Sequence, residues 1–207
     1  MPHISVPAAE LNTRLDRLRC AMTEKDPAWS MLLLDNTLDM YYFTGTMQDG
    51  ALVVTPDQAT LFVRRSFDVA KDESAFADIR PMGSFRGIKE VYPDIPETVY
   101  VAAKTMTLQK LSMLNKHLPF APKPADSVLS GLRSVKSAYE LDCMRESGRL
   151  HRYVIEGLAV SHRAGQSLRL HRHLDCNEVH RLVRAQAARR RHRPAGHSVR
   201  LARLPYR

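Results

Sequence analysis

The amino-acid composition changes abruptly at Val160, and this change limits what the chain can fold into. The 47 residues that follow contain no Ile, Phe, Met, Trp or Lys. Ordering a backbone costs roughly 1–2 kcal/mol per residue, and buried large apolar side chains are what offset that cost. Residues 161–207 offer only scattered Leu, Val and Ala, so we expect the folded part of the chain to lie in its first 160 residues.

The positive charge is concentrated in the same C-terminal segment. Residues 161–207 hold 12 Arg against one Asp and one Glu, a net charge of +10, together with six of the nine His. The first 160 residues carry 19 basic and 20 acidic side chains and are close to neutral. Enrichment in Arg, Ala, His and Pro without Lys is typical of a GC-rich gene read out of frame. The composition therefore favours a disordered or frameshift-derived tail, and a genuine basic arm is the alternative.

The cysteines and the N-terminus favour a cytoplasmic protein. Cys20, Cys143 and Cys176 are odd in number and have no motif spacing, and no signal peptide precedes them. A reducing compartment is the simplest interpretation. Cys20 and Cys143 fall on predicted helices, at positions where a small buried residue is expected. No apolar run approaches the ~20 residues of a membrane span, so we predict no membrane partner.

Hydrophobic periodicity predicts alternating helices and strands over the first 135 residues. Residues 8–25 read as an amphipathic helix, because Leu11, Leu15, Leu18 and Met22 recur at spacings of 4, 3 and 4. Strands are expected at 29–34, 38–43, 51–54, 60–63, 78–82 and 98–102. Further helices are expected at 66–76, 107–118 and 126–132, with a short helix or turn at 85–91. Leu108, Leu111 and Leu114 should share one side of the helix at 107–118. Since a hairpin (51–63) sits among strands separated by helices, the expected fold class is α/β, a mixed sheet flanked by helices.

A long helix is predicted directly after this domain. Ser137 and Glu140 form an S-x-x-E capping box, in which each side chain accepts a hydrogen bond from the other residue's backbone N–H. The helix should run to about Val160. Its apolar residues recur mostly at three- and four-residue steps, at Leu141, Met144, Gly148, Val154 and Leu158.

Residues 132–145 carry the pattern L-R-x-x-K-S-x-x-E-L-x-x-M-R, which resembles the linker of the creatinase/prolidase/Xaa-Pro aminopeptidase family. Shorter fragments resemble that family's N-terminal domain in the same order: Arg14-Leu15-x-x-Leu18-x-x-x-Met22, Leu33-Leu34 with Asn36, Tyr41-Tyr42-Phe43-Thr44-Gly45, and the strands at 50–54 and 59–63 with Asp68 and Ala70 after them. The resemblance implies a creatinase-type domain over 8–135 and a linker helix over 136–160. The catalytic "pita-bread" domain should follow, but residues 161–207 are far too few to form it.

Each fragment also has a plain structural interpretation. We expect residues 41–43 to be core and cross-strand packing residues, and Gly45 to end a strand with a positive φ, which Gly adopts at little cost. Arg133 and Lys136 should cover the domain surface at the linker. Glu140 should cap a helix and has no expected catalytic role.

The resemblance implies a catalytic domain whose two divalent metals are held by two Asp, one His and two Glu. After the linker this chain has only Asp175 and Glu178 as carboxylates, so we predict no catalytic, cofactor-binding or metal-binding residues. Gly196-His197 resembles a G-H pair of the family. In this chain, however, the His-Glu pair that should follow it is missing. The His, Asp and Cys residues of 171–180 are zinc-ligand types, but their spacing matches no structural zinc site, and an incidental cluster is favoured.

The sequence thus predicts a non-catalytic, truncated N-terminal domain of an Xaa-Pro aminopeptidase or prolidase-like metallopeptidase. Its implied role is subunit contact and shaping of the active-site mouth, with a second copy or a catalytic metallopeptidase chain as partner. The apolar face of the linker helix should then be partly exposed. One alternative is a split metallopeptidase, active only with a catalytic chain. The other is a nucleic-acid-binding protein, in which residues 189–193 contact phosphates non-specifically.

Overall fold

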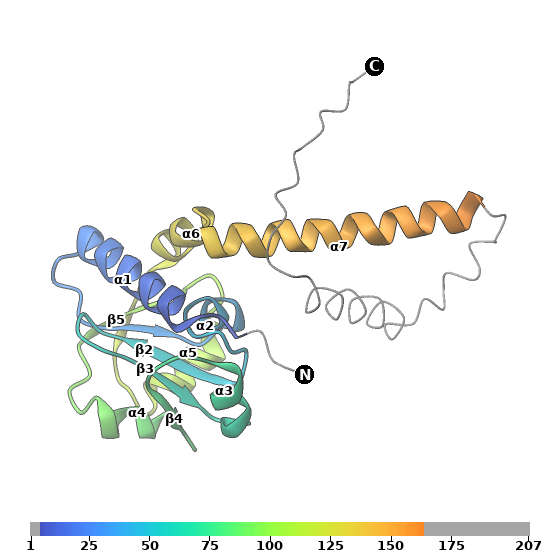
Figure 1. Ribbon diagram of the computed structural model, residues 1–207. Coiled ribbons are helices and arrows are strands. Elements are labelled where there is room, and N and C mark those ends of the chain that lie inside the picture. The colour runs from blue at the N-terminus through green and yellow to red at the C-terminus, as the bar shows by residue number, and fades with distance from the viewer. Residues whose placement is uncertain (1–4, 164–207) are drawn as a thin grey trace. The chain divides into compact units, whose positions relative to one another are not determined.

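The computed structural model describes residues 5–163, which divide into two compact units between Tyr139 and Glu140 (Figure 1). The first unit is a mixed six-stranded sheet flanked by helices, which confirms the predicted α/β fold class. The second unit begins within a long helix. Among residues 5–163, no helix is both long enough and apolar enough to cross a membrane. The side-chain interpretations of residues 161–207 lie outside the described part of the chain.

The sheet has the strand order β4-β3-β2-β1-β5-β6. Strands β1, β2 and β3 pair antiparallel, while β4 pairs parallel with β3, β5 with β1, and β6 with β5. The predicted hairpin is confirmed, since Gly50 pairs with Val63 and Val54 with Ala59. The strand bounds are β1 Leu32–Leu34, β2 Gly50–Val54, β3 Ala59–Val63, β4 Ile79–Pro81, β5 Thr98–Val101 and β6 Ala121–Pro124.

Both faces of the sheet are covered by helices. Side chains alternate between the faces along a strand, so Leu32 and Leu34 enter one core cluster and Leu33 enters the other. Helices α1, α2 and α6 contribute to the first cluster and α4 and α5 to the second; α1 and α4 lie on opposite sides of the strands in Figure 1. The helix bounds are α1 Ala8–Lys25, α2 Thr37–Thr44, α3 Phe67–Glu73, α4 Arg86–Val91, α5 Leu108–Asn115, α6 Asp126–Ser134 and α7 Ala138–Arg163.

The first helix forms as predicted and is fastened to the sheet where it ends. Leu11, Leu15, Leu18 and Met22 are all buried. The helix stops at Asp26, whose carboxylate accepts a hydrogen bond from the Tyr100 hydroxyl at 2.8 Å. That bond, with a second from the Ala28 N–H and the nearby Lys123 ammonium, lowers the pKa of Asp26. Burial, together with the same bond to Asp26, raises the pKa of Tyr100.

The strand predicted at residues 38–43 is wrong, because this segment is helix α2. The Asn36 side chain accepts a hydrogen bond from the Asp39 N–H at 2.8 Å and caps the N-terminus. Gly45 ends the helix in the left-handed region with φ 77°, so its predicted positive φ is confirmed, but at a helix C-terminus. Short apolar runs fit buried helices and strands equally well, and here the caps decide. Tyr42 and Phe43 are buried as expected, whereas Tyr41 is exposed.

Strand β6 was not predicted, because its sequence is Ala-Pro-Lys-Pro. Ala121 donates its N–H to the carbonyl of Glu97 at 2.7 Å, and Ala125 donates to Val101 at 2.9 Å. Since a strand alternates with a period of two, residues 122 and 124 turn their backbone nitrogens toward the open edge. Proline is tolerated at those positions, because no hydrogen bond of the ladder is lost there.

One predicted helix face packs only in part, and one prediction of burial is wrong. Leu108 is 86% exposed, since α5 begins at that residue and only Leu114 of the expected leucine face is fully buried. Cys20 and Cys143 are also exposed rather than buried. Cys20 lies two positions from both Leu18 and Met22, and residues two apart on a helix face different directions.

Candidate functional site

A network of polar side chains holds the start of the linker, residues 132–139, against helices α1 and α2. We call this network the linker anchor. It joins groups that are far apart in the sequence, and the contacts described below give each member at least one partner in another element. Its side chains are Glu10, Arg14, Asp39, Tyr42, Arg133 and Ser137.

Arg14 is the central cation of the linker anchor and is only 5% exposed. Its Nε donates to Glu10 Oε1 at 2.9 Å, one helical turn earlier. Its Nη1 donates to the carbonyl oxygen of Tyr42 at 2.7 Å. The guanidinium carbon also lies 4.3 Å from the centroid of the Tyr42 ring, within cation–π range. Arg14 therefore couples α1 to α2 through charge, hydrogen bonding and ring contact.

The same carboxylate reaches the linker. Ser137 Oγ donates to Glu10 Oε1 at 2.7 Å, so one oxygen accepts from both Arg14 and Ser137. The Tyr42 hydroxyl donates to the carbonyl oxygen of Leu132 at 3.3 Å. Tyr139 packs against the core cluster of α1, α2 and α6. Helix α7 then begins at the residue after Ser137, where the capping box predicts it.

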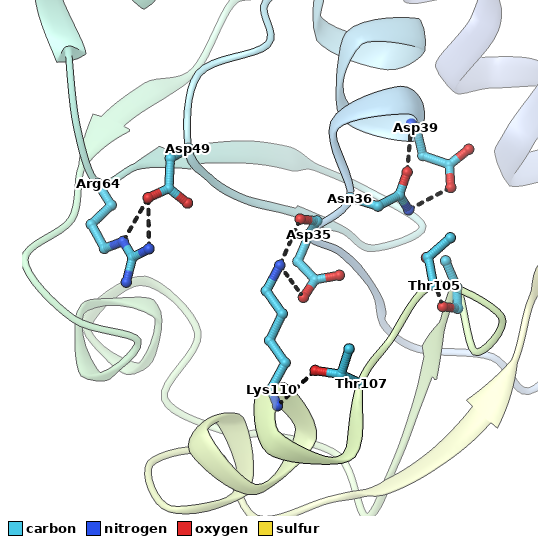
Figure 2. Close-up of polar contacts among 9 residues, drawn as sticks. Asp35, Asn36, Asp39, Asp49, Arg64, Thr105, Thr107 and Lys110 are labelled. Carbon is cyan, nitrogen blue, oxygen red and sulfur yellow. Dashed lines mark hydrogen bonds and ion pairs between the residues drawn. The ribbon is translucent and has the colours of Figure 1, made fainter.

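A second ion pair fixes the end of α6. Arg133 pairs with Asp39 of α2, whose side chain is buried. Asp39 is itself positioned by Asn36, whose Nδ2 donates to Asp39 Oδ2 at 2.6 Å (Figure 2). Lys136 donates to the carbonyl oxygen of Arg133 and is exposed, as expected for a surface residue at the linker. Arg133 is more than a surface residue, because it pairs with a carboxylate inside the domain.

The roles of Glu10, Arg14 and Asp39 were not predicted from the sequence. One signal for Arg14 was present, because it falls between Leu11 and Leu15 on the apolar stripe of α1 and follows Glu10 by four residues. A charged residue on a buried face needs a partner, and a carboxylate one turn away supplies it. Nothing comparable in the sequence connects Asp39 to Arg133.

Among residues 5–163, no three His, Cys, Asp or Glu side chains are grouped closely enough to hold a metal ion. The His-rich cluster at 171–180, Gly196-His197 and the Arg-rich run at 189–193 lie outside the described residues. The contacts of the linker anchor hold the linker segment in place. Through this segment the domain leads into α7.

Known structures share this fold. An Xaa-Pro dipeptidase from Bacillus anthracis is similar with a TM-score of 0.63 and 17% identity, over 72% of this chain and 43% of that chain. Dipeptidase PepE from Mycobacterium ulcerans is similar with a TM-score of 0.58 and 25% identity, over 72% of this chain and 44% of that chain. The chain thus covers less than half the length of these two dipeptidases. A search of curated proteins finds no match.

One similar solved chain has nearly the same extent as the sheet domain. It is an XXA-pro aminopeptidase from Streptococcus pyogenes, with a TM-score of 0.53 and 17% identity, over 61% of this chain and 99% of that chain. At this identity the likeness shows the fold alone. It indicates that the fold of the first unit also occurs in a solved chain that contains little besides this domain.

The sequence model of the creatinase/prolidase N-terminal domain matches residues 14–135. That range runs from the central arginine of the linker anchor to the residue that follows α6, and it includes all six strands. Family match and fold therefore agree over more than half of the sequence. The chain belongs to the creatinase/prolidase N-terminal domain family.

Proposed function

We propose that the chain acts as the non-catalytic N-terminal domain of a metallopeptidase of the Xaa-Pro aminopeptidase or prolidase type. In this proposal residues 8–135 form the domain and residues 136–160 the linker helix. The domain makes subunit contact and shapes the mouth of an active site that a catalytic domain or chain supplies. The observation that supports the proposal is the anchored linker at the end of the family match, where Ser137 is held by Glu10 directly before α7 begins.

Exposed apolar side chains on α7 support a docking role. Leu141, Met144 and Ile155 are 39%, 57% and 64% exposed. They are separated by three and eleven residues, which places them on one stripe of a helix. Partial exposure of this face was predicted from the sequence, and the exposure of Leu141 and Met144 supports the proposal. The side chains of Val154 and Leu158 lie outside the described residues. Exposed apolar side chains along one stripe of a helix are typical of a surface that packs on another protein.

Replacing Leu141 and Met144 together with glutamate should strongly weaken self-association. We expect the wild-type chain to sediment as a concentration-dependent oligomer, and the double variant to raise the dissociation constant by roughly a hundredfold, because two carboxylates would be buried without partners. The measurement is sedimentation velocity over a range of protein concentrations. The matched control is Cys143→Glu with Ser147→Glu, which adds the same charge on other faces of α7. A wild-type chain that stays monomeric throughout would contradict self-association through this stripe.

The two alternative functions stay predictions. Nucleic-acid binding depends on the Arg-rich residues 189–193, which lie outside the described part of the chain. A split metallopeptidase would use the same domain and the same anchor, and it differs only in requiring a separate catalytic chain for activity. The proposed contact through α7 is compatible with that alternative.

A further inference from the structure

A groove with basic and apolar walls lies on the side of the sheet covered by α4 and α5. It consists of two adjoining pockets of about 270 and 320 Å³. They share Arg64, Met82, Phe85 and Met113 as lining residues, so they form one continuous depression, which we call the basic groove. Each pocket is near the lower end of the size range for small-molecule sites, and together they fall within it.

Two cations in the wall of the basic groove are held by carboxylates. Arg64, just after β3, donates from Nε and Nη2 to Asp49 Oδ2 at 2.9 and 2.6 Å (Figure 2). Lys110 Nζ lies 2.9 Å from Asp35 Oδ2 and donates to the carbonyl oxygen of Asp35 at 3.0 Å. The Asp35 side chain is almost fully buried directly after β1. These contacts fix the positions of both cations without filling the groove.

The charge of the basic groove exceeds what its carboxylates neutralise. Arg64 and Lys110 are matched by Asp49 and Asp35, but Lys116 also lines the groove, and within residues 5–163 it forms no ion pair. His117 lines the same pocket. The groove therefore presents net positive charge to a ligand.

The remaining wall is apolar. Met82 is buried beneath the groove, Phe85 is partly buried, and Met113 is exposed where the two pockets meet. Methionine side chains adapt to ligands of irregular shape, and aromatic rings offer a flat packing surface. Convergent cations beside an apolar wall recognise molecules that carry both an anionic group and an apolar body.

We propose that the basic groove binds a small organic anion, a carboxylate or a phosphate ester. Arg64 and Lys116 bind the anionic group, and Met82, Phe85 and Met113 contact the apolar part. This inference does not depend on the proposed role in a metallopeptidase, since none of these residues belongs to the linker anchor or to α7. The site lies within the sheet domain alone.

The test is a titration of the full chain, labelled with ¹⁵N, with benzoate, phenyl phosphate, inorganic phosphate and uncharged benzamide. The amide chemical shifts show which residues the probe contacts. They therefore distinguish binding in the basic groove from binding to the Arg-rich C-terminal segment. We expect benzoate or phenyl phosphate to bind with a Kd of about 1 mM or tighter, with shifts centred on Gly83, Ser84 and Met113. Stronger binding of one probe identifies the anion. Benzamide and inorganic phosphate should bind at least fivefold more weakly, because each lacks half of the recognised chemistry.

Two variants make the test specific. Lys116→Gln should weaken binding at least fivefold, and Met113→Glu should abolish it by placing a carboxylate where the two pockets meet. Lys71→Gln, on α3 and outside both pockets, is the matched control and should bind as the wild type does. Unchanged binding in Lys116→Gln, equal binding of benzamide, or no groove shifts at 10 mM probe would each overturn the proposal. Thermal unfolding of both variants confirms that they are folded.

Discussion

Replacing Arg14 with methionine is expected to lower the free energy of unfolding by about 3 kcal/mol. Methionine keeps much of the apolar stem but removes the charge, and breaking a buried ion pair from one side typically costs about 3–5 kcal/mol. Glu10 would lose a charged partner, and the carbonyl oxygen of Tyr42 would lose its donor. Urea denaturation monitored by circular dichroism measures the change.

The exposed pair between Arg149 and Glu146 provides the matched control. Its atoms lie 3.1 Å apart, but the Arg149 and Glu146 side chains are 69% and 41% exposed. Since exposed pairs contribute at most about 1 kcal/mol, Arg149→Met should change stability by less than that. Adding Glu10→Gln to Arg14→Met should cost less than the sum of the single changes, because the two groups are coupled. If Arg14→Met costs no more than Arg149→Met, the linker anchor does not stabilise the domain.

Replacing Gly50 with alanine should destabilise the sheet by about 3 kcal/mol or leave the chain unfolded. A Cβ at this position would lie 1.9 Å from the carbonyl oxygen of Phe62, and that atom belongs to the backbone of β3. Relief requires β2 and β3 to move apart where Gly50 pairs with Val63. Overpacking usually costs about 1–3 kcal/mol when side chains can adjust, and here a backbone must adjust instead.

Gly131→Ala is the control for this effect. Gly131 lies inside helix α6, and a Cβ added there would meet nothing within 4 Å. Alanine is preferred to glycine in a helix by about 0.5–1 kcal/mol, so this variant should be more stable than the wild type. Equal stability of the two variants in thermal and urea unfolding would contradict the steric account of Gly50.

Local sequence patterns predicted those helices and strands whose buried residues repeat at one regular spacing or whose ends carry a clear turn sequence. Helix α1 shows this, because its four core residues keep the 3.6-residue repeat and Asp26-Pro27 marks its end. Strands β2 and β3 were equally clear, since a turn sequence separates two apolar runs. The hydrophobic pattern did not distinguish helix from strand in short apolar segments. The run at 38–43 became a helix through its caps, and β6 was obscured by its prolines.

The linker anchor could be predicted only in part. The capping box and the linker pattern place the start of α7, and both are local features. The contact between Ser137 and Glu10 joins residues 127 positions apart, and the pair of Arg133 with Asp39 depends on α2 being a helix. Because residue 39 was placed on a strand, its carboxylate could not be connected to the linker. Long-range polar contacts follow from the fold, and a local pattern does not contain them.

The most direct test of the proposed role is a peptidase assay of the purified full chain. With Mn²⁺ or Co²⁺ present, we expect it to hydrolyse an Xaa-Pro dipeptide no faster than the metal in buffer, while an Xaa-Pro dipeptidase assayed in parallel is active. The activity should be followed across a sizing column, so that a contaminating enzyme is recognised by a different elution position. Hydrolysis that co-elutes with the chain and depends on the metal would contradict a non-catalytic N-terminal domain.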